Sequence, residues 1–256
     1  MKRETIKIQK NKYAYFAGDF HLGKPNAKVS LERELKLIRW FDYIKKDAQE
    51  IFLMGDVFDF WFEYKHVIQK ENQLFINKIR ELIDLGINIQ YFKGNHDLWM
   101  LDFFENIGVK VYDHPQLMKI NEKKILIGHG DGLGDGDYGY KILKKIFTNK
   151  VCQALYRLIH PDVGLKLGKW FSGSHKDIRG NLNAKRNNER LVDYCKKFDS
   201  EISNDAYIFG HSHYTSKEIV NKNSFYYNAG DWITDSSYLV FSNNNFKINK
   251  FEKDIN

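Results

Sequence analysis

The sequence predicts an α/β protein built around a parallel sheet, on three observations. Apolar runs that suit buried strands alternate with segments of helical periodicity three times before residue 100. Such strand–helix–strand repeats form right-handed parallel units, whose strand carboxyl ends share one edge of the sheet. Each of these strands is followed by a loop that begins with Gly and carries Asp, Asn or His. We therefore expect polar side chains to gather along a single sheet edge.

The first 112 residues are expected to hold four strands and three helices. The predicted strands are Tyr13–Ala17, Ile51–Met54, Ile87–Phe92 and Val109–Tyr112. The predicted helices run from an N-cap at Ser30 to about Asp47, from Val67 to Leu85 with Gly86 closing the helix, and over Leu98–Asn106. Ile51–Met54 is continuously apolar, as expected for a strand that is buried on both faces.

The remainder of the chain is predicted to place a helical insertion between strands. A hairpin with its turn at Asn121–Lys124 ends in a strand at Ile125–Ile127. From about 137 to 198 the pattern indicates helices with no strand between them, so we expect an insertion within one domain, residues 1–256. The last predicted strands are Ala206–Phe209, Lys217–Val220, Phe225–Ala229 and Tyr238–Phe241.

Composition limits the class of protein. With 256 residues and 43% hydrophobic residues, the chain can bury a large core. Cys152 and Cys195 form no C-x-x-C pattern, so we expect neither a disulfide framework nor a thiolate metal site. We see no secretory signal and no apolar stretch long enough to span a membrane. The net charge of +7 indicates an anionic partner, which sign alone leaves open among nucleic acid, lipid headgroups and a phosphorylated substrate.

Five Gly-initiated loops carry the residues that suggest chemistry. They are Gly18-Asp19-Phe20-His21, Gly55-Asp56-Val57-Phe58-Asp59, Gly94-Asn95-His96-Asp97, Gly128-His129-Gly130-Asp131 and Gly210-His211-Ser212-His213. Oxygen and imidazole donors without sulfur suit Mn²⁺, Fe, Zn²⁺ or Mg²⁺. Asp56 follows the central strand, and since a carboxylate has two oxygens we expect it to bridge two cations. A single Gly-Asp or Gly-Asn step is more often an ordinary turn, but five at one sheet edge favour a metal site.

The ordered series of loops resembles the calcineurin-like metallophosphoesterase superfamily over Tyr13 to about Phe241. The resemblance implies a four-layer α/β/β/α sandwich around a two-metal centre. Carried over by motif, one divalent ion would be held by Asp19, His21, Asp56 and His213, and the other by Asp56, Asn95, His129 and His211.

The resemblance also implies a mechanism in which water attacks phosphorus in line and no phospho-enzyme forms. The expected catalytic residues are Asp56, Asn95 and His96, with His96 stabilising or protonating the leaving group. Asp97 is expected to orient His96 or Asn95. Asp59 and Asp131 either support the ligands of their loops or cap those loops.

The predicted insertion is basic and apolar at once. Between Lys141 and Trp170 there are seven Lys or Arg residues and one acid, Asp162, which gives a local net charge of +6. Bulky apolar residues recur through the same stretch. It can lie on an anionic membrane surface or cover an apolar pocket. It can equally be a lid that packs on the domain with its lysines solvated, and a nucleic-acid groove is the less favoured interpretation.

Residues 55–62, 94–99 and 129–141 closely resemble the UDP-2,3-diacylglucosamine diphosphatases of lipid A biosynthesis, in the form found in Bacteroidetes-like bacteria. That resemblance implies a Mn²⁺-preferring enzyme, peripheral on the cytoplasmic face of the inner membrane, that yields UMP and 2,3-diacylglucosamine 1-phosphate. Ser172–Lys176 corresponds to the family's later substrate cluster. The implied substrate contacts are Asn95, His96, Asp137, Tyr140, Lys176 and His211.

One position departs from that family. His96 stands where the best-studied branch has Arg, which bears on the contact to the diphosphate. The alternatives are another metallophosphoesterase, either a nucleotide phosphodiesterase or a nuclease, and a scaffold of this fold without turnover. Every expected ligand position is filled, which disfavours the scaffold.

Overall fold

The computed structural model describes residues 3–174 and 180–251. Its strands are β1 (Glu4–Ile6), β2 (Tyr13–Ala17), β3 (Ala48–Leu53), β4 (Asn88–Phe92), β5 (Lys110–Tyr112), β6 (Gln116–Ile120), β7 (Lys123–Gly128), β8 (Ala206–Phe209), β9 (Ser216–Asn221), β10 (Ser224–Asn228), β11 (Ser237–Ser242) and β12 (Asn245–Lys250). Its helices are α1 (Ala27–Ile44), α2 (Gln73–Asp84), α3 (Phe103–Asn106), α4 (Tyr138–Phe147), α5 (Lys150–Tyr156), α6 (Pro161–Ser174) and α7 (Gly180–Glu201).

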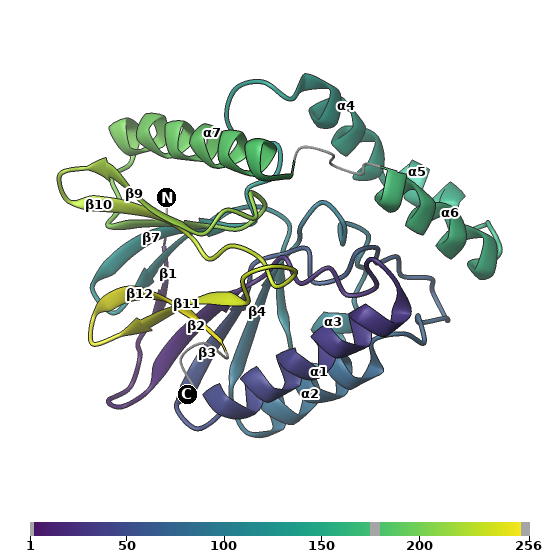
Figure 1. The fold of residues 1–256 in the computed structure, drawn as a ribbon, viewed down its shortest axis with the longest axis horizontal. Coiled ribbons are helices and arrows are strands. Elements are labelled where there is room, and N and C mark those ends of the chain that lie inside the picture. The colour runs from purple at the N-terminus through teal and green to yellow at the C-terminus, as the bar shows by residue number, and fades with distance from the viewer. Residues whose placement is uncertain (1–2, 175–179, 252–256) are drawn as a thin grey trace.

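The strands form two six-stranded sheets (Figure 1). The first sheet has the order β12-β11-β2-β3-β4-β5, and β2 to β5 pair in parallel, as the alternation of strands and helices predicts. The second sheet has the order β1-β6-β7-β8-β10-β9, in which β8 pairs in parallel with both β7 and β10. Strands β2, β3, β4, β7 and β8 all precede the predicted polar loops.

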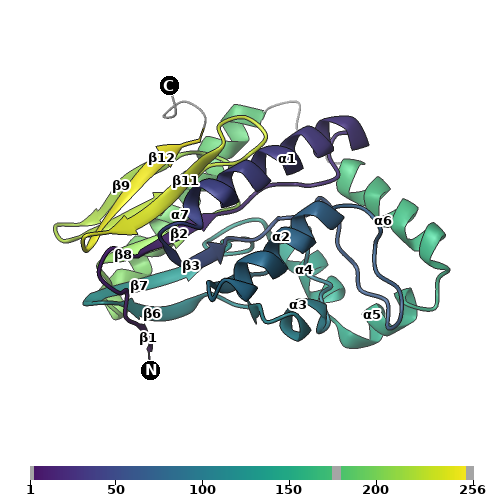
Figure 2. The same cartoon turned by 90° about the horizontal axis from the view of Figure 1, so that it is seen from below.

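Helices cover the outer face of each sheet, which gives four layers. Figure 2 shows α1 and α2 lying along the first sheet, where Trp40 and Ile79 join the buried cluster of Ile51 and Tyr91. Apolar side chains from both sheets, including Phe52 and Ile208, fill the space between the sheets. On the far side, Leu191 and Cys195 of α7 pack against Tyr207 and Tyr226 of the second sheet. The predicted α/β/β/α sandwich is confirmed.

Several element boundaries differ from the prediction. Asn26, not Ser30, caps α1 by accepting a hydrogen bond from the Val29 amide (3.1 Å), while the Ser30 hydroxyl accepts one from the Gly23 amide (2.7 Å). Residues 67–72 lie outside α2, so that helix is shorter than expected. Strands β1 and β12 were not predicted, because both are polar edge strands with few buried positions.

Residues 138–174, which we term the helical arm, comprise α4, α5 and α6. The arm lies over aromatic residues of the loops after β3 and β4: Trp99 packs on Phe147 and Tyr156, and Phe62 also packs on Tyr156. Helix α7, the last part of the predicted insertion, belongs instead to the outer layer of the second sheet. Among the described residues, no helix is long and apolar enough to cross a membrane. The single-domain boundary stays a prediction.

Candidate metal centre

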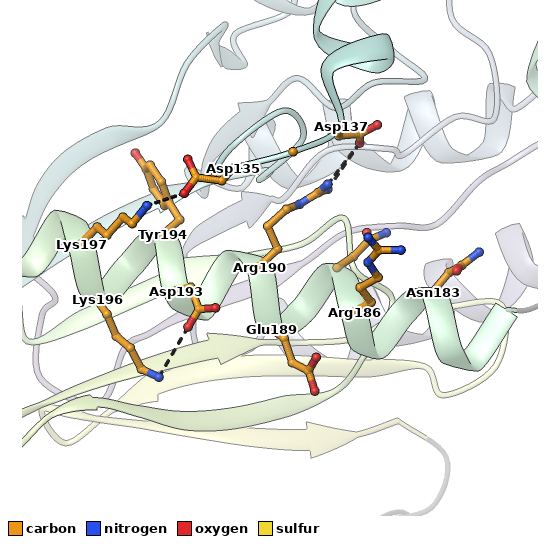
Figure 3. Close-up of a pocket in the computed structure, with 13 residues that line it drawn as sticks. Asp135, Asp137, Asn183, Arg186, Glu189, Arg190, Asp193, Tyr194, Lys196 and Lys197 are labelled. Carbon is orange, nitrogen blue, oxygen red and sulfur yellow. Dashed lines mark hydrogen bonds and ion pairs between the residues drawn. The ribbon is translucent and has the colours of Figure 1, made fainter.

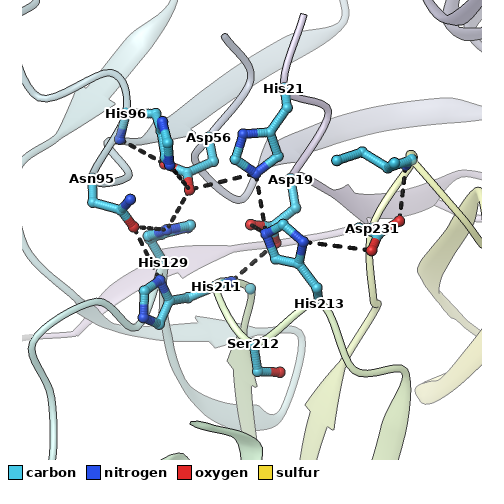
Figure 4. Close-up of polar contacts among 12 residues, drawn as sticks. Asp19, His21, Asp56, Asn95, His96, His129, His211, Ser212, His213 and Asp231 are labelled. Atoms are coloured by element: carbon cyan, nitrogen blue, oxygen red, sulfur yellow. Dashed lines mark hydrogen bonds and ion pairs between the residues drawn. The ribbon is translucent and has the colours of Figure 1, made fainter. Parts of the chain in front are cut away.

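The five predicted loops bring their polar side chains together at the strand ends (Figure 4). One donor atom from each of Asp19, His21, Asp56 and His213 lies within 4.8 Å of the others. A second group of the same kind consists of Asp56, His129 and His211. The two groups share Asp56, the residue expected to bridge two cations.

The Asp56 carboxylate faces both groups through a single oxygen. Its Oδ1 accepts a hydrogen bond from the His96 amide (2.9 Å), so this atom is already engaged. Its Oδ2 lies 3.4 Å from His129 Nε2 and 3.7 Å from His21 Nε2. Asp56 Oδ2 thus lies between the two groups, and the bridging role of Asp56 stays a prediction.

In the first group, imidazole nitrogens and carboxylate oxygens face one another at short distances. His21 Nε2 lies 3.1 Å from His213 Nε2, which in turn lies 3.3 Å from Asp19 Oδ1. Asp19 Oδ1 is buried and has no hydrogen-bond partner within the described chain. Two imidazole nitrogens and an unpartnered carboxylate oxygen fit a divalent cation of intermediate hardness.

The second group converges on the amide oxygen of Asn95. Asn95 Oδ1 lies 3.2 Å from His129 Nε2 and 3.0 Å from His211 Nδ1. His129 Nδ1 lies 2.7 Å from the Met54 carbonyl, to which it can only donate. That hydrogen bond fixes the ring so that Nε2 points at Asn95 and Asp56, which is how proteins orient a metal-binding imidazole.

Burial and charge set opposite pKa shifts among the imidazoles. Burial lowers the pKa of both His21 and His211 to about 4, so each is neutral at pH 7 and can offer a lone pair. Burial also acts to lower the pKa of His129, but the Asp56 carboxylate outweighs it and raises that pKa to about 10. Burial also acts to lower the pKa of His213, but the Asp19 and Asp231 carboxylates outweigh it and raise that pKa to about 10. The buried carboxylates thus attract positive charge, which protons or divalent cations can supply.

The backbone at the centre is held in an unusual conformation. Five of the proposed ligands have left-handed φ values, from 45° to 67°: Asp19, His21, Asp56, His211 and His213. Outside glycine and asparagine this region is sparsely populated, costs about 1–3 kcal/mol per residue, and is typical of functional sites. The surrounding sandwich therefore maintains these loops against local preference.

Two glycines allow the loops to approach the carboxylates closely. A Cβ at Gly94 would lie 2.2 Å from Asp56 Oδ1, and a Cβ at Gly210 would lie 2.7 Å from Asp19 Oδ2. Neither has a positive φ, so both serve close approach instead of the sharp turning that the sequence suggested.

Residues behind the ligands hold the loops in place. Asp97 accepts hydrogen bonds from the Val57 amide (2.9 Å), the Gly94 amide (2.6 Å) and the Tyr91 hydroxyl (2.6 Å). Asp97 thus braces the loops that carry Asp56 and Asn95 through the backbone, and the expectation that it orients His96 or Asn95 stays a prediction. Burial, with the nearby Asp56 charge, raises the pKa of Asp97 to about 6.

Sequence reasoning missed two supporting residues. Asp231 Oδ2 lies 3.5 Å from His213 Nδ1, and Arg33 donates to the backbone carbonyls of Phe20 and His21 (3.1 and 2.9 Å). Gly230-Asp231 comes shortly after β10 and is a sixth place where Gly is followed by Asp, Asn or His at a strand end, a signal that could have identified Asp231. Arg33 lies within a helix and carries no such signal.

The predicted substrate contacts at the start of the helical arm are engaged by the His129 loop and by α7. The Tyr140 hydroxyl donates to Asp131 Oδ2 (2.5 Å), to which Lys144 also pairs (2.6 Å). Asp137 pairs with Arg190 of α7 at 3.4 Å, beside a pocket of about 830 Å³ between residues 134–137 and that helix (Figure 3). Lys176 lies outside the described residues.

A four-layer sandwich with an Asp-centred cluster of His, Asp and Asn at its strand ends is the arrangement of a metallophosphoesterase. The sequence profile described as calcineurin-like phosphoesterase matches residues 14–215. The chain belongs to the calcineurin-like phosphoesterase family, whose members bind divalent metals.

Among curated proteins, the chain is similar to a UDP-2,3-diacylglucosamine hydrolase of Porphyromonas gingivalis, with 30% identity over 93% of this chain and 97% of that protein. A protein of the same name from Histophilus somni is 26% identical over 92% of this chain and 99% of its own length. Among solved structures, vacuolar protein sorting 29 from Cryptosporidium parvum gives a TM-score of 0.42 at 12% identity, covering 93% of this chain and 96% of that chain.

Proposed function

We propose that this protein hydrolyses the diphosphate bond of UDP-2,3-diacylglucosamine, giving UMP and 2,3-diacylglucosamine 1-phosphate for lipid A biosynthesis. The observation that carries the proposal is the Asp56-centred cluster, in which every expected ligand is present, in a chain similar over nearly its full length to UDP-2,3-diacylglucosamine hydrolases. The substrate is the one for which these relatives are named.

Two Mn²⁺ ions would occupy the centre, with Mg²⁺, Fe and Zn²⁺ as alternatives. Asp19, His21 and His213 would hold one ion, and Asn95, His129 and His211 the other, with Asp56 Oδ2 between them. Divalent cations bound there would lower the pKa of a water molecule and offset charge on the phosphates. Fixed ligand geometry removes the need for the protein to reorganise as the substrate reacts.

His96 would act on the leaving group. Its Nδ1 lies 2.8 Å from the Asp59 carbonyl, and its Nε2 lies 4.0 Å from Asp56 Oδ2. Because Nδ1 donates to backbone, Nε2 is the nitrogen that faces the substrate, and it can donate a hydrogen bond or a proton to a phosphate oxygen from the imidazolium form of the ring. Water attacks the nucleotide-side phosphorus, so UMP gains the hydroxyl group and the lipid phosphate is the leaving group.

The helical arm would receive the acyl chains and contact the membrane. Its exposed apolar side chains include Tyr138, Ile142, Val151, Leu155, Leu158 and Trp170. Its lysines add positive charge, which favours anionic headgroups. These features support a peripheral position on the cytoplasmic face of the inner membrane.

Release of UMP from UDP-2,3-diacylglucosamine tests the proposal. We expect Mn²⁺-dependent UMP release that EDTA abolishes and Mn²⁺ restores. The second candidate is another metallophosphoesterase, which is favoured by His96 in place of the expected Arg. Parallel assays with cyclic nucleotides and single-stranded DNA test this candidate. Turnover of either alternative without UMP release from the lipid nucleotide would replace the proposed substrate.

A further inference from the structure

Ser172 of α6 links the helical arm to His96, beside the expected ligand Asn95. Its hydroxyl donates to the Asp59 carbonyl (2.7 Å) and lies 2.9 Å from His96 Nδ1. His96 Nδ1 is itself 2.8 Å from the same carbonyl. The three atoms form a closed triangle, which links α6 to a residue beside the ligand Asn95.

This triangle fixes the His96 ring from behind. A hydrogen on Nδ1 has two oxygen acceptors in reach, the Asp59 carbonyl and the Ser172 hydroxyl, so Nδ1 is held as the donor. The other ring nitrogen, Nε2, then faces the centre. On its opposite side, the ring packs edge to face against His21, with centroids 4.8 Å apart.

Small residues on one face of α6 permit this approach. Gly164, Gly168 and Ser172 are four residues apart and share a helix face. A Cβ at Gly168 would lie 2.1 Å from Phe60 Cζ, and one at Gly164 would lie 2.1 Å from the Tyr64 hydroxyl oxygen. A larger residue at either position requires α6 or the facing side chain of Phe60 or Tyr64 to shift, and a shift of α6 would carry Ser172 away from His96.

We propose that Ser172 is a positioning residue for His96, and that α6 must be docked against Phe60 for His96 to act. The inference rests on the proposed function, because it takes phosphoester hydrolysis as the reaction in which His96 takes part. The helical arm then has two roles: it covers the substrate, and through Ser172 it positions His96.

Kinetics of a double-mutant cycle test the coupling. With bis(p-nitrophenyl) phosphate and Mn²⁺, Ser172→Ala is expected to lower kcat roughly five- to tenfold, the scale of one lost hydrogen bond, with KM unchanged. Ser172→Thr keeps the hydroxyl and should retain most of the activity. In a His96→Ala background, Ser172→Ala should have no further effect. Asp162→Ala, exposed on the same helix, is the matched control and should match wild type.

A second readout does not depend on activity. In histidine-labelled protein, long-range ¹H–¹⁵N NMR spectra should show His96 protonated at Nδ1 in wild type and Ser172→Thr, with the signal assigned by its loss in His96→Ala. Ser172→Ala should shift this signal toward a mixture of tautomers. Gly168→Ala should reproduce the spectral and kinetic effects by displacing α6.

An unchanged His96 signal in Ser172→Ala, or an equal loss of kcat with and without His96, would overturn the proposal. A raised KM with unchanged kcat would overturn it too, since Ser172 would then contact substrate. If wild type hydrolyses neither this diester nor the lipid nucleotide, the proposed function fails, and the NMR comparison still decides the role of Ser172.

Discussion

The metal centre buries polar side chains, whereas the helical arm exposes apolar and aromatic ones. At the centre, Asp19 is 0% and Asp56 1% exposed, and contacts within the chain hold both from several directions. On the arm, Leu158 is 82% and Tyr138 72% exposed, although both are apolar or aromatic. The centre is thus arranged by the folded chain alone, whereas the arm keeps apolar surface for a partner outside it.

This difference separates chemistry from recognition. Changes at the centre should affect turnover of every substrate, because the ligands and the loops behind them set the geometry of reaction. Changes on the outer face of the arm should affect lipid substrates and membranes only. Ser172, where the two regions meet, is the proposed exception.

The largest effect is expected from Asp56→Ala. Removal of the carboxylate between the two ligand groups should reduce kcat/KM by at least about a thousandfold on both the generic diester and the lipid nucleotide. Asp84→Ala, at the exposed end of α2, is the matched control. Wild-type rates for Asp56→Ala on either substrate would refute the bridging role.

Gly94→Ala should have the next largest effect. Its new Cβ would meet Asp56 Oδ1 at 2.2 Å, so the loop must shift, and we expect a loss in kcat of roughly a hundredfold through misplaced ligands. Gly139→Ala, where nothing lies within 4 Å, should keep kcat within about twofold of wild type. Equal rates for the two variants would show that the close approach at Gly94 has no role.

Charge reversal on the arm should affect membranes and spare chemistry. Lys145, Lys150 and Lys166 are exposed, whereas Lys144 is excluded because it pairs with Asp131. Changing all three to Glu should weaken partition to vesicles containing phosphatidylglycerol by at least roughly tenfold at low salt. Hydrolysis of the generic diester should stay within about twofold of wild type. Unchanged vesicle sedimentation would favour a lid with solvated lysines.

The smallest effect is expected from Leu158→Ala, whose free energy of unfolding is compared with that of Leu53→Ala. Leu53 is fully buried, so its truncation should lower the free energy of unfolding by about 2–5 kcal/mol. Truncation of the exposed Leu158 should change it by less than about 0.5 kcal/mol in chemical denaturation. A cost above about 1 kcal/mol for Leu158→Ala would mean that this face of the arm packs within the protein.

The sequence predicted the regions whose local pattern and tertiary role agree. The part of β3 that was predicted, Ile51–Leu53, is continuously apolar and buried, and the Gly-Asp and Gly-His steps mark where such strands end. The cap of α1 was misplaced, since Asn26 and Ser30 are both good caps and only the fold engages Ser30 with Gly23.

Contacts between distant segments could not be predicted. Three such contacts join residues that are 40, 18 and 76 positions apart in the sequence: Asp97 with Val57, Asp231 with His213, and Ser172 with His96. No local periodicity encodes such pairs. The hydrogen bond from the His96 amide to Asp56 Oδ1 likewise comes from a neighbouring loop, which the Asp56 motif does not contain.

A crystal structure of the Mn²⁺-loaded protein would show whether Asp56 joins two cations, if anomalous difference maps are collected near the manganese edge. We predict two anomalous peaks about 3.5–4 Å apart, with Asp56 Oδ2 coordinating both. A single peak, or two peaks without Asp56 between them, would refute the two-metal centre bridged by Asp56.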